Sequence, residues 1–219
     1  MGKRLKKKTP KKNSKRSTNT LRIIGGKWRS RKLSFIDAQG LRPTPDRIRE
    51  TLFNWLQGYI HGANCLDLFA GSGILGLEAL SRGAENVHFV EMNKAVAKQL
   101  EANLNLLNAD ANVYQQDTFD FLQDYIRGST PSYKSAKKGG GDKNYNIIFL
   151  DPPYRQNLLE KALTILILCE KDNHLVDTET LIYLEHESEE RFDWTNYGLE
   201  VLKEATAGQV KSFLLAFKN

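Results

Sequence analysis

Residues 66 to 80 read Leu66-Asp67-Leu68-Phe69-Ala70-Gly71-Ser72-Gly73-Ile74-Leu75-Gly76-Leu77-Glu78-Ala79-Leu80. The apolar run from Cys65 to Phe69 predicts a buried strand, interrupted by the single carboxylate of Asp67. Three glycines with the spacing G-x-G-x-x-G follow, and apolar residues then return every three to four positions, which predicts a helix. A strand, a glycine turn and a helix bring backbone N–H groups close to a ligand. Because short glycine patterns also arise by chance, this segment alone indicates only a candidate site for a nucleotide-like molecule.

After residue 65 the chain alternates between apolar runs of strand length and segments of helical periodicity. Strands joined through helices form a mainly parallel sheet covered on both faces, so the expected fold class is α/β. The last two strands are separated by Ala207-Gly208 and predict an antiparallel hairpin at one edge. The expected strands are 65–69, 87–90, 112–115, 145–150, 181–185, 199–203 and 211–217. The expected helices are 74–82, 94–107, 118–126 and 158–170.

Acidic residues follow two of these strands, where ligands of parallel sheets bind. Glu91 lies 20 residues after Gly71, which is the spacing of an acid that accepts hydrogen bonds from both ribose hydroxyls. Asp117 follows the next strand and is expected to accept from an adenine amino group. Each acid alone also fits a solvated loop, but the two together beside the glycine turn indicate an adenosine compound. The expected cofactor-binding residues are Asp67, Phe69, Gly71, Ser72, Gly73, Glu91, Met92, Asp117 and Thr118.

The run Asp151-Pro152-Pro153-Tyr154 follows another buried strand and is the most specific signal. The two prolines stop the strand and fix the backbone, because each has a set φ and no N–H. The Pro152 carbonyl is then free as an acceptor beside the Asp151 carboxylate, and two adjacent acceptors suit an exocyclic amine. Tyr154 offers a flat face on which a base can stack. These residues are therefore the expected catalytic set, although a simple turn after a strand remains the structural alternative.

A further helix is expected to start near Thr44, with Thr44 as its N-cap and Pro45 at its first position. The residues that recur at helical spacing and are expected in the core are Ile48, Leu52, Trp55, Leu56 and Tyr59. Arg47 and Arg49 fall off this face and are expected to be solvated or to face a ligand.

Positive charge is concentrated at the N-terminus. Residues 1–32 carry 14 of the 32 Lys and Arg residues and no acid, so the net charge of +6 comes from this segment and the remainder is acidic. A basic arm on an acidic body indicates a polyanionic partner, with a solubilising tail as the alternative. The expected organisation is a disordered basic tail over 1–19, a hairpin over 20–40 and one catalytic domain over 41–219, with a flexible insertion over 127–144.

The segments 21–24 and 32–35 predict two short strands joined through Gly25-Gly26. Basic residues around one tryptophan suit a surface that contacts phosphates and stacks on a base. The alternative is a solvated hairpin with a packed Trp28. The expected RNA-binding residues are Arg22, Lys27, Trp28, Arg29, Arg31, Lys32 and Arg42.

Other classes of protein are disfavoured by composition. No apolar run approaches the roughly 18 residues of a membrane span, and the basic N-terminus lacks the apolar region of a secretory signal, so a cytoplasmic protein is expected. Cys65 and Cys169 lie in apolar runs and are expected to be buried free thiols. The four histidines lack metal-ligand spacing, so no metal site is expected.

Together, the glycine turn, Glu91, Asp117 and the Asp-Pro-Pro-Tyr run resemble class I S-adenosylmethionine-dependent methyltransferases that act on exocyclic amines. The segments 21–33, 41–56 and 66–84 more narrowly resemble the bacterial RsmD family of 16S ribosomal RNA guanine-N2 methyltransferases. The resemblance covers about residues 20–219. The long lysine-rich tail and the long 127–144 insertion depart from the family pattern, which puts surface contacts rather than the chemistry in question.

This resemblance implies a seven-stranded Rossmann-like sheet and an N-terminal hairpin that helps to hold RNA. It implies S-adenosylmethionine as the cofactor, with the glycine turn at its methionine part, Glu91 at its ribose and Asp117 at its adenine. It also implies a monomer that acts on one guanine of the small ribosomal subunit or of an assembly intermediate, without a metal or a membrane.

Three other interpretations remain open. An adenine-N6 methyltransferase acting on RNA or DNA shares the Asp-Pro-Pro-Tyr run, and only the N-terminal resemblance disfavours it. A dehydrogenase fits the glycine spacing and Glu91, but leaves the run at 151–154 and the basic arm unexplained. A non-catalytic RNA-binding or assembly protein rests on the basic tail alone.

Overall fold

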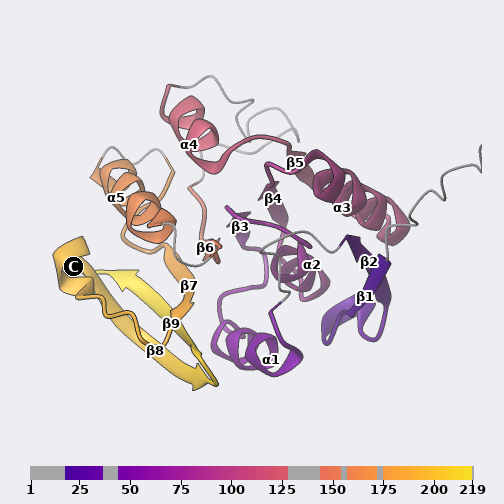
Figure 1. Cartoon of the computed structure of the whole chain (residues 1–219), viewed down its shortest axis with the longest axis horizontal. Helices are drawn as coiled ribbons and strands as arrows, with labels where there is room; N and C mark the ends of the chain where they lie inside the picture. The colour runs from indigo at the N-terminus through magenta and orange to yellow at the C-terminus, as the bar shows by residue number, and fades with distance from the viewer. Residues whose placement is uncertain (1–17, 37–43, 128–143, 154–156, 172–174, 219) are drawn as a thin grey trace, which may run out of the picture.

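The computed structural model describes residues 18–36, 44–127, 144–153, 157–171 and 175–218 (Figure 1). Within these residues the large sheet consists of β3 (Asn64–Asp67), β4 (Asn86–Val90), β5 (Asn112–Tyr114), β6 (Ile147–Leu150), β7 (Leu181–Glu187), β8 (Leu199–Ala207) and β9 (Val210–Phe217). The strand order is β5-β4-β3-β6-β7-β9-β8. Neighbouring strands from β5 to β7 pair in parallel, whereas β9 pairs antiparallel with β7 and β8. This confirms the predicted α/β fold with its antiparallel C-terminal hairpin.

The helices that cover the sheet are α1 (Asp46–Trp55), α2 (Ile74–Ser81), α3 (Lys94–Leu107), α4 (Thr118–Ile126) and α5 (Leu158–Lys171). Side chains alternate along each buried strand, so that Cys65 enters one core and Leu66 the other. The first core contains side chains of α1, α2 and α3, and the second contains side chains of α4 and α5. Figure 1 shows the two helix groups on either side of the central strands.

The bounds of α3 and α4 agree with the prediction, whereas β8 is longer than expected and continues to Ala207. Its middle residues are exposed, so a search for apolar runs could not find its full length. A register irregularity between Val201 and Lys203 further disturbs the alternation of side chains. β8 lies at the edge of the sheet.

The N-terminal segment forms a separate two-stranded antiparallel sheet of β1 (Thr18–Arg22) and β2 (Lys32–Ile36). The first strand both begins and ends earlier than the predicted 21–24, so Thr18 and Asn19 belong to β1 rather than to the expected disordered tail over 1–19. The connection to β2 contains a short 3-10 helix, η1 (Gly26–Trp28), held against α2. The Ser81 hydroxyl donates to the Gly25 carbonyl at 2.5 Å and accepts from the Trp28 N–H at 3.0 Å. The hairpin is thereby attached to the domain beside α2 and α3 (Figure 1).

Two predictions for α1 are wrong. The helix begins at Asp46 with Pro45 at the N-cap position, and no side chain caps it, so Thr44 is not the capping residue. Tyr59 was expected in the core but is 55% exposed, because the helix ends at Trp55 and the chain turns before Tyr59. The remaining pattern holds, and Ile48, Leu52 and Leu56 are buried.

Arg49 is neither solvated nor oriented toward a ligand, as had been expected, but is completely buried. Its Nη1 donates to Glu78 Oε1 at 2.7 Å and to the Arg22 carbonyl at 3.0 Å. Glu78 in turn accepts from the N–H groups of Ile24 at 2.5 Å and Gly25 at 3.3 Å. A buried ion pair with these additional hydrogen bonds fixes the hairpin to α1 and α2.

Both cysteines are buried and free, as predicted. Burial raises the pKa of the Cys65 thiol, which keeps it in the unreactive neutral form. None of the described helices is long and apolar enough to cross a membrane. In the described ranges no group of three or more His, Cys, Asp or Glu side chains is placed to share a metal ion.

Candidate active site

The loops that follow β3, β4 and β6 lie along one edge of the large sheet, because these strands are parallel neighbours. The N–H of Ala70 donates to the carbonyl of Val90 at 2.9 Å, which joins the glycine turn to the end of β4. The N–H of Leu68 donates to the carbonyl of Phe149 at 3.1 Å, which joins the end of β3 to the end of β6. The structure therefore brings the glycine turn, Glu91 and Asp151 to the same edge.

The glycine turn is shaped by Gly73, which is the N-cap of α2 and has a φ of 74°. A side chain is strained at this φ, and a Cβ on Gly73 would lie 2.3 Å from Leu100 Cδ1. Gly76 is on α2 and allows the helix to approach β4, since its Cβ would lie 2.2 Å from a Phe89 ring carbon. The G-x-G-x-x-G spacing thus permits both a left-handed turn and close packing of the helix on the sheet.

The Glu91 carboxylate bridges the glycine turn and the segment that follows β4. Its Oε2 accepts from the Gly71 N–H at 2.9 Å, and its Oε1 accepts from the Asn93 N–H at 2.6 Å. Burial raises the pKa of the Glu91 carboxyl, and the two N–H donors oppose that rise. The next side chain, Met92, is 68% exposed, so an apolar group stands in solvent beside a buried acid.

Asp67 lies behind the glycine turn, and only 2% of it is exposed. Its carboxylate accepts from the Gly76 N–H at 3.3 Å. Burial and, more weakly, the charge of Glu91 raise the pKa of Asp67 to about 7, while the Gly76 N–H opposes the rise. Nearby, Ser72 is also buried, and the half-buried Phe69 ring packs edge-on against the Phe119 ring.

Asp117 is the N-cap of α4, and its Oδ1 accepts from the N–H groups of Phe119 at 2.8 Å and Asp120 at 3.3 Å. The hydroxyl of Thr118 donates to the Leu68 carbonyl. Both residues therefore hold the local backbone, and the half-buried Asp117 stands where the chain leaves β5.

Asp151 directly follows β6 and has partners that the sequence did not reveal. The Thr44 hydroxyl donates to Asp151 Oδ2 at 3.5 Å. Burial first, and then the charges of Glu185 and Asp67, raise the pKa of Asp151 well above its usual range. Pro152 is buried and Pro153 is exposed. Tyr154 was predicted as a catalytic residue and lies outside the described residues.

Thr44 and Glu185 are the functional candidates that sequence reasoning missed. By its place before α1 Thr44 fits a helix cap, and its hydroxyl contact with Asp151 becomes visible only in the folded chain. Glu185 is the last residue of the predicted strand 181–185 and Glu91 directly follows the predicted strand 87–90, so a search for acids at predicted strand ends would also have selected Glu185, although β7 continues to Glu187.

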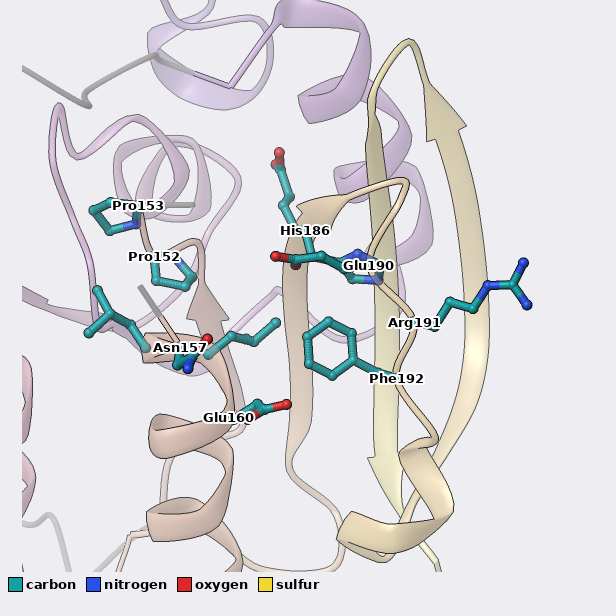
Figure 2. Close-up of a pocket in the computed structure, with 11 residues that line it drawn as sticks. Pro152, Pro153, Asn157, Glu160, His186, Glu190, Arg191 and Phe192 are labelled. Atoms are coloured by element: carbon teal, nitrogen blue, oxygen red, sulfur yellow. The ribbon is translucent and has the colours of Figure 1, made fainter. Parts of the chain in front are cut away.

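A pocket of about 220 Å³ opens beside the Asp-Pro-Pro loop (Figure 2). Pro152 and Pro153 form one wall, and Phe192 lies opposite them. The side chain of Arg191 points away from the pocket in this view. The acidic and aromatic residues in the lining are Glu160, Glu185, His186, Glu190 and Phe192.

The basic side chains of the hairpin are exposed at Lys27, Arg29, Arg31 and Lys32. Trp28 is only 8% exposed and packs in the first core, with the Lys27 amine 4.1 Å from the ring centroid. The Trp28 ring is therefore packed in the core and is not free to stack on a base, whereas RNA contact by the basic side chains of the hairpin stays a prediction. Arg42 was also expected to contact RNA and lies outside the described residues.

Comparisons with known proteins agree with this arrangement. The family described as conserved hypothetical protein 95 matches residues 21–216. The chain is 44% identical over 201 residues to the ribosomal RNA small subunit methyltransferase D of Escherichia coli K12, covering 91% of each chain. It is 44% identical over 197 residues to the protein of the same name from Haemophilus influenzae, covering 87% of this chain and 90% of the relative. The solved structure of yhhF from Escherichia coli superimposes with a TM-score of 0.74 at 44% identity, over 91% of this chain and 99% of that one.

Proposed function

Because the chain belongs to the conserved hypothetical protein 95 family, we propose that it transfers a methyl group from S-adenosylmethionine to the exocyclic N2 of a guanine in 16S ribosomal RNA. It is an rRNA methyltransferase, as its relatives named ribosomal RNA small subunit methyltransferase D are. The dehydrogenase and the non-catalytic interpretations are thereby set aside. The observation that carries the site assignment is that the glycine turn and the Asp151 carboxylate occupy the same sheet edge on adjacent strands, β3 and β6.

The glycine-turn side of this edge fits an adenosine cofactor. The Leu100 side chain packs where a Cβ of Gly73 would lie, which fixes the turn, and the half-buried Gly71 brings its backbone toward the sheet edge. The Glu91 carboxylate accepts one N–H at each oxygen, and each oxygen has a further lone pair for a ribose hydroxyl. The exposed Met92 side chain offers an apolar surface to the adenine, whose amino group Asp117 would bind. S-adenosylmethionine supplies a methyl group on a sulfonium, which is already activated for transfer.

The Asp-Pro-Pro side positions the target amine. The lone pair of guanine N2 is delocalised into the ring, so the amine is a poor nucleophile. Asp151 and the Pro152 carbonyl accept its two N–H bonds and thereby aim the lone pair at the methyl group. The stacking of Tyr154 on the base stays a prediction from the sequence. Positioning and fixed electrostatics then supply most of the rate enhancement, with no metal required.

The hairpin provides the electrostatic surface for the RNA. Its exposed side chains at Arg29, Arg31 and Lys32 contact phosphates, together with the basic residues of the 1–19 tail. The substrate is a small ribosomal subunit or an assembly intermediate, and the enzyme acts as a monomer in the cytoplasm.

Methyl transfer to small ribosomal subunits from cells that lack this protein tests the proposal. Nucleoside analysis of the product should show N2-methylguanosine. N6-methyladenosine would instead establish the adenine enzyme, and no methylated nucleoside would refute the proposed function.

The variant Asp151→Asn tests the site. The amide oxygen of asparagine can still accept one amine N–H but cannot take up a proton, so methyl transfer should slow by roughly 10²-fold or more because the proton acceptor is lost. Binding of S-adenosylmethionine, measured by calorimetry, should persist. The exposed Asp120→Asn on α4 is the matched control and should retain full activity.

A further inference from the structure

A chain of oxygen atoms runs from Asp151 into the protein. The Thr44 hydroxyl lies 3.5 Å from Asp151 Oδ2 and also hydrogen bonds to the Glu185 carboxyl. Glu185 Oε1 accepts from the Tyr183 hydroxyl at 2.6 Å. Glu185 is 3% exposed and Tyr183 is fully buried, so both groups are largely shielded from bulk water, and Glu185 borders the pocket beside the Asp-Pro-Pro loop.

The number of protons on Asp151, Thr44 and Glu185 determines whether a proton can move between them. Thr44 has one hydroxyl proton but faces two carboxyl groups, so it donates to one of them and accepts from the other only when that one is protonated. A hydroxyl in this position can accept a proton from one acid while it passes its own to the second. The chain Asp151, Thr44, Glu185 is therefore a route along which a proton can move without any large displacement.

We infer that Thr44 and Glu185 carry away the proton that Asp151 takes from the guanine amine, an inference that rests on the proposed function. As the N2–C bond forms and the C–S bond of the sulfonium breaks, N2 becomes positively charged and an N–H proton passes to Asp151. Asp151 then donates a proton to Thr44 Oγ1, which releases its own to Glu185. Thr44 and Glu185 are thus positioning residues for Asp151, and atoms and charges balance at each step.

The proton leaves through the pocket of Figure 2, because Glu185 lines that pocket. Pro152 and Pro153 also line this pocket, so Glu185 and the Asp-Pro-Pro loop border the same space. The neighbouring ionisable groups are Glu160, His186 and Glu190 in the pocket lining. In the interior of the protein, the ionisable groups around this route are Asp67, Asp151 and Tyr183.

Burial raises the pKa values of both Asp151 and Glu185, and the charge of Glu185 raises the pKa of Asp151 further. The two acids therefore titrate as a pair, and the rate should rise with pH as the pair loses its protons. Removing the charge of Glu185 lowers the pKa of Asp151. The acidic limb of the pH–rate profile should consequently move to lower pH in Glu185→Gln, while the plateau falls.

Single-turnover methyl transfer to small ribosomal subunits by the full-length chain tests this inference. Thr44→Val should slow the reaction roughly 10- to 100-fold, at the lower end of what a positioned acid or base contributes, whereas Thr44→Ser should stay near the wild-type rate. The matched controls are Thr164→Val on the exposed face of α5 and Glu200→Gln on β8, and both should behave as wild type. Calorimetric titration with S-adenosylmethionine identifies the variants that are folded.

The two proposals fail in different ways. If the wild-type chain transfers no methyl group, the proposed function fails. If the wild type is active, but folded Thr44→Val is as fast as wild type or Glu185→Gln leaves the acidic limb in place, the proton route is refuted. A lower plateau rate in Glu185→Gln with an unchanged acidic limb of the pH–rate profile would indicate a merely structural role of Glu185. That result would also refute the proton route.

Discussion

The guanidinium of Arg49 donates through Nε to the carbonyl oxygen of Thr44 at 3.1 Å. The same side chain bonds the Arg22 carbonyl at the end of β1 and the Glu78 carboxylate on α2. One buried cation therefore connects the N-terminal hairpin to the residue whose hydroxyl contacts Asp151. The position of Thr44 at the site depends on the hairpin being attached to the domain.

This linkage predicts that Arg49→Met is strongly destabilising. The substitution removes the 2.7 Å ion pair from the buried Glu78, which keeps only the longer 3.4 Å contact with Arg82, and breaking a buried pair in this way costs about 3–5 kcal/mol. The free energy of unfolding, measured in urea, should fall by that amount. The exposed Arg47→Met on the same helix is the control, and its change should stay within about 0.5 kcal/mol. Equal effects at the two positions would contradict the buried linkage.

The glycine turn can be tested with two substitutions at similar backbone angles. Gly73 and Gly208 have φ values of 74° and 64°, so alanine at either position costs roughly 1–2 kcal/mol of backbone strain. Only at Gly73 does the new Cβ meet another residue, the buried Leu100 side chain. Gly73→Ala should therefore lower the melting temperature more than Gly208→Ala, and only Gly73→Ala should weaken binding of S-adenosylmethionine. Unchanged cofactor affinity in Gly73→Ala would remove the turn from the binding site.

The raised pKa of Asp67 predicts that the stability of the fold depends on pH. Its pKa is about 7 in the folded protein and 3.8 as the ordinary value, so between these pH values the folded state holds a proton that the unfolded state has lost. Stability contributed by the neutral acid is therefore present below about pH 4 and is lost as the pH rises toward 7, by a few kcal/mol in total. Asp67→Asn keeps a neutral acceptor for the Gly76 N–H and lacks this loss. The difference in unfolding free energy between wild type and variant should shift by that amount across the window, and parallel curves would disprove the raised pKa.

The basic hairpin predicts a change in salt dependence. Replacing Arg29 and Arg31 with glutamine removes two exposed charges, so the slope of log K against log salt for RNA binding should become shallower by about 2. The single-turnover rate at saturating RNA should stay unchanged, because neither side chain lies at the sheet edge. Lys203→Gln on β8 is the control and should leave the slope unaltered. An unchanged slope in the double variant would show that the hairpin does not contact phosphates.

Periodicity in the sequence was enough to locate the seven strands, the glycine turn and the acids at the ends of three strands. These features are local, because a strand, a turn and a helix are each encoded within about 15 consecutive residues, and parallel connections place all strand ends on one edge. The residues Glu91 and Asp151 could therefore be assigned to one edge of the sheet before their distances were known.

Only the tertiary structure shows which side chains from distant parts of the sequence contact the residues at that edge. Thr44 and Asp151 are 107 positions apart, and no local pattern links a threonine before one helix to an acid after a distant strand. Arg49 has the spacing of a surface residue, yet it is buried because Glu78 and the carbonyls of Arg22 and Thr44 supply its hydrogen-bond partners. Such partners come from segments that meet only on folding, and burial of polar groups depends on all of them together.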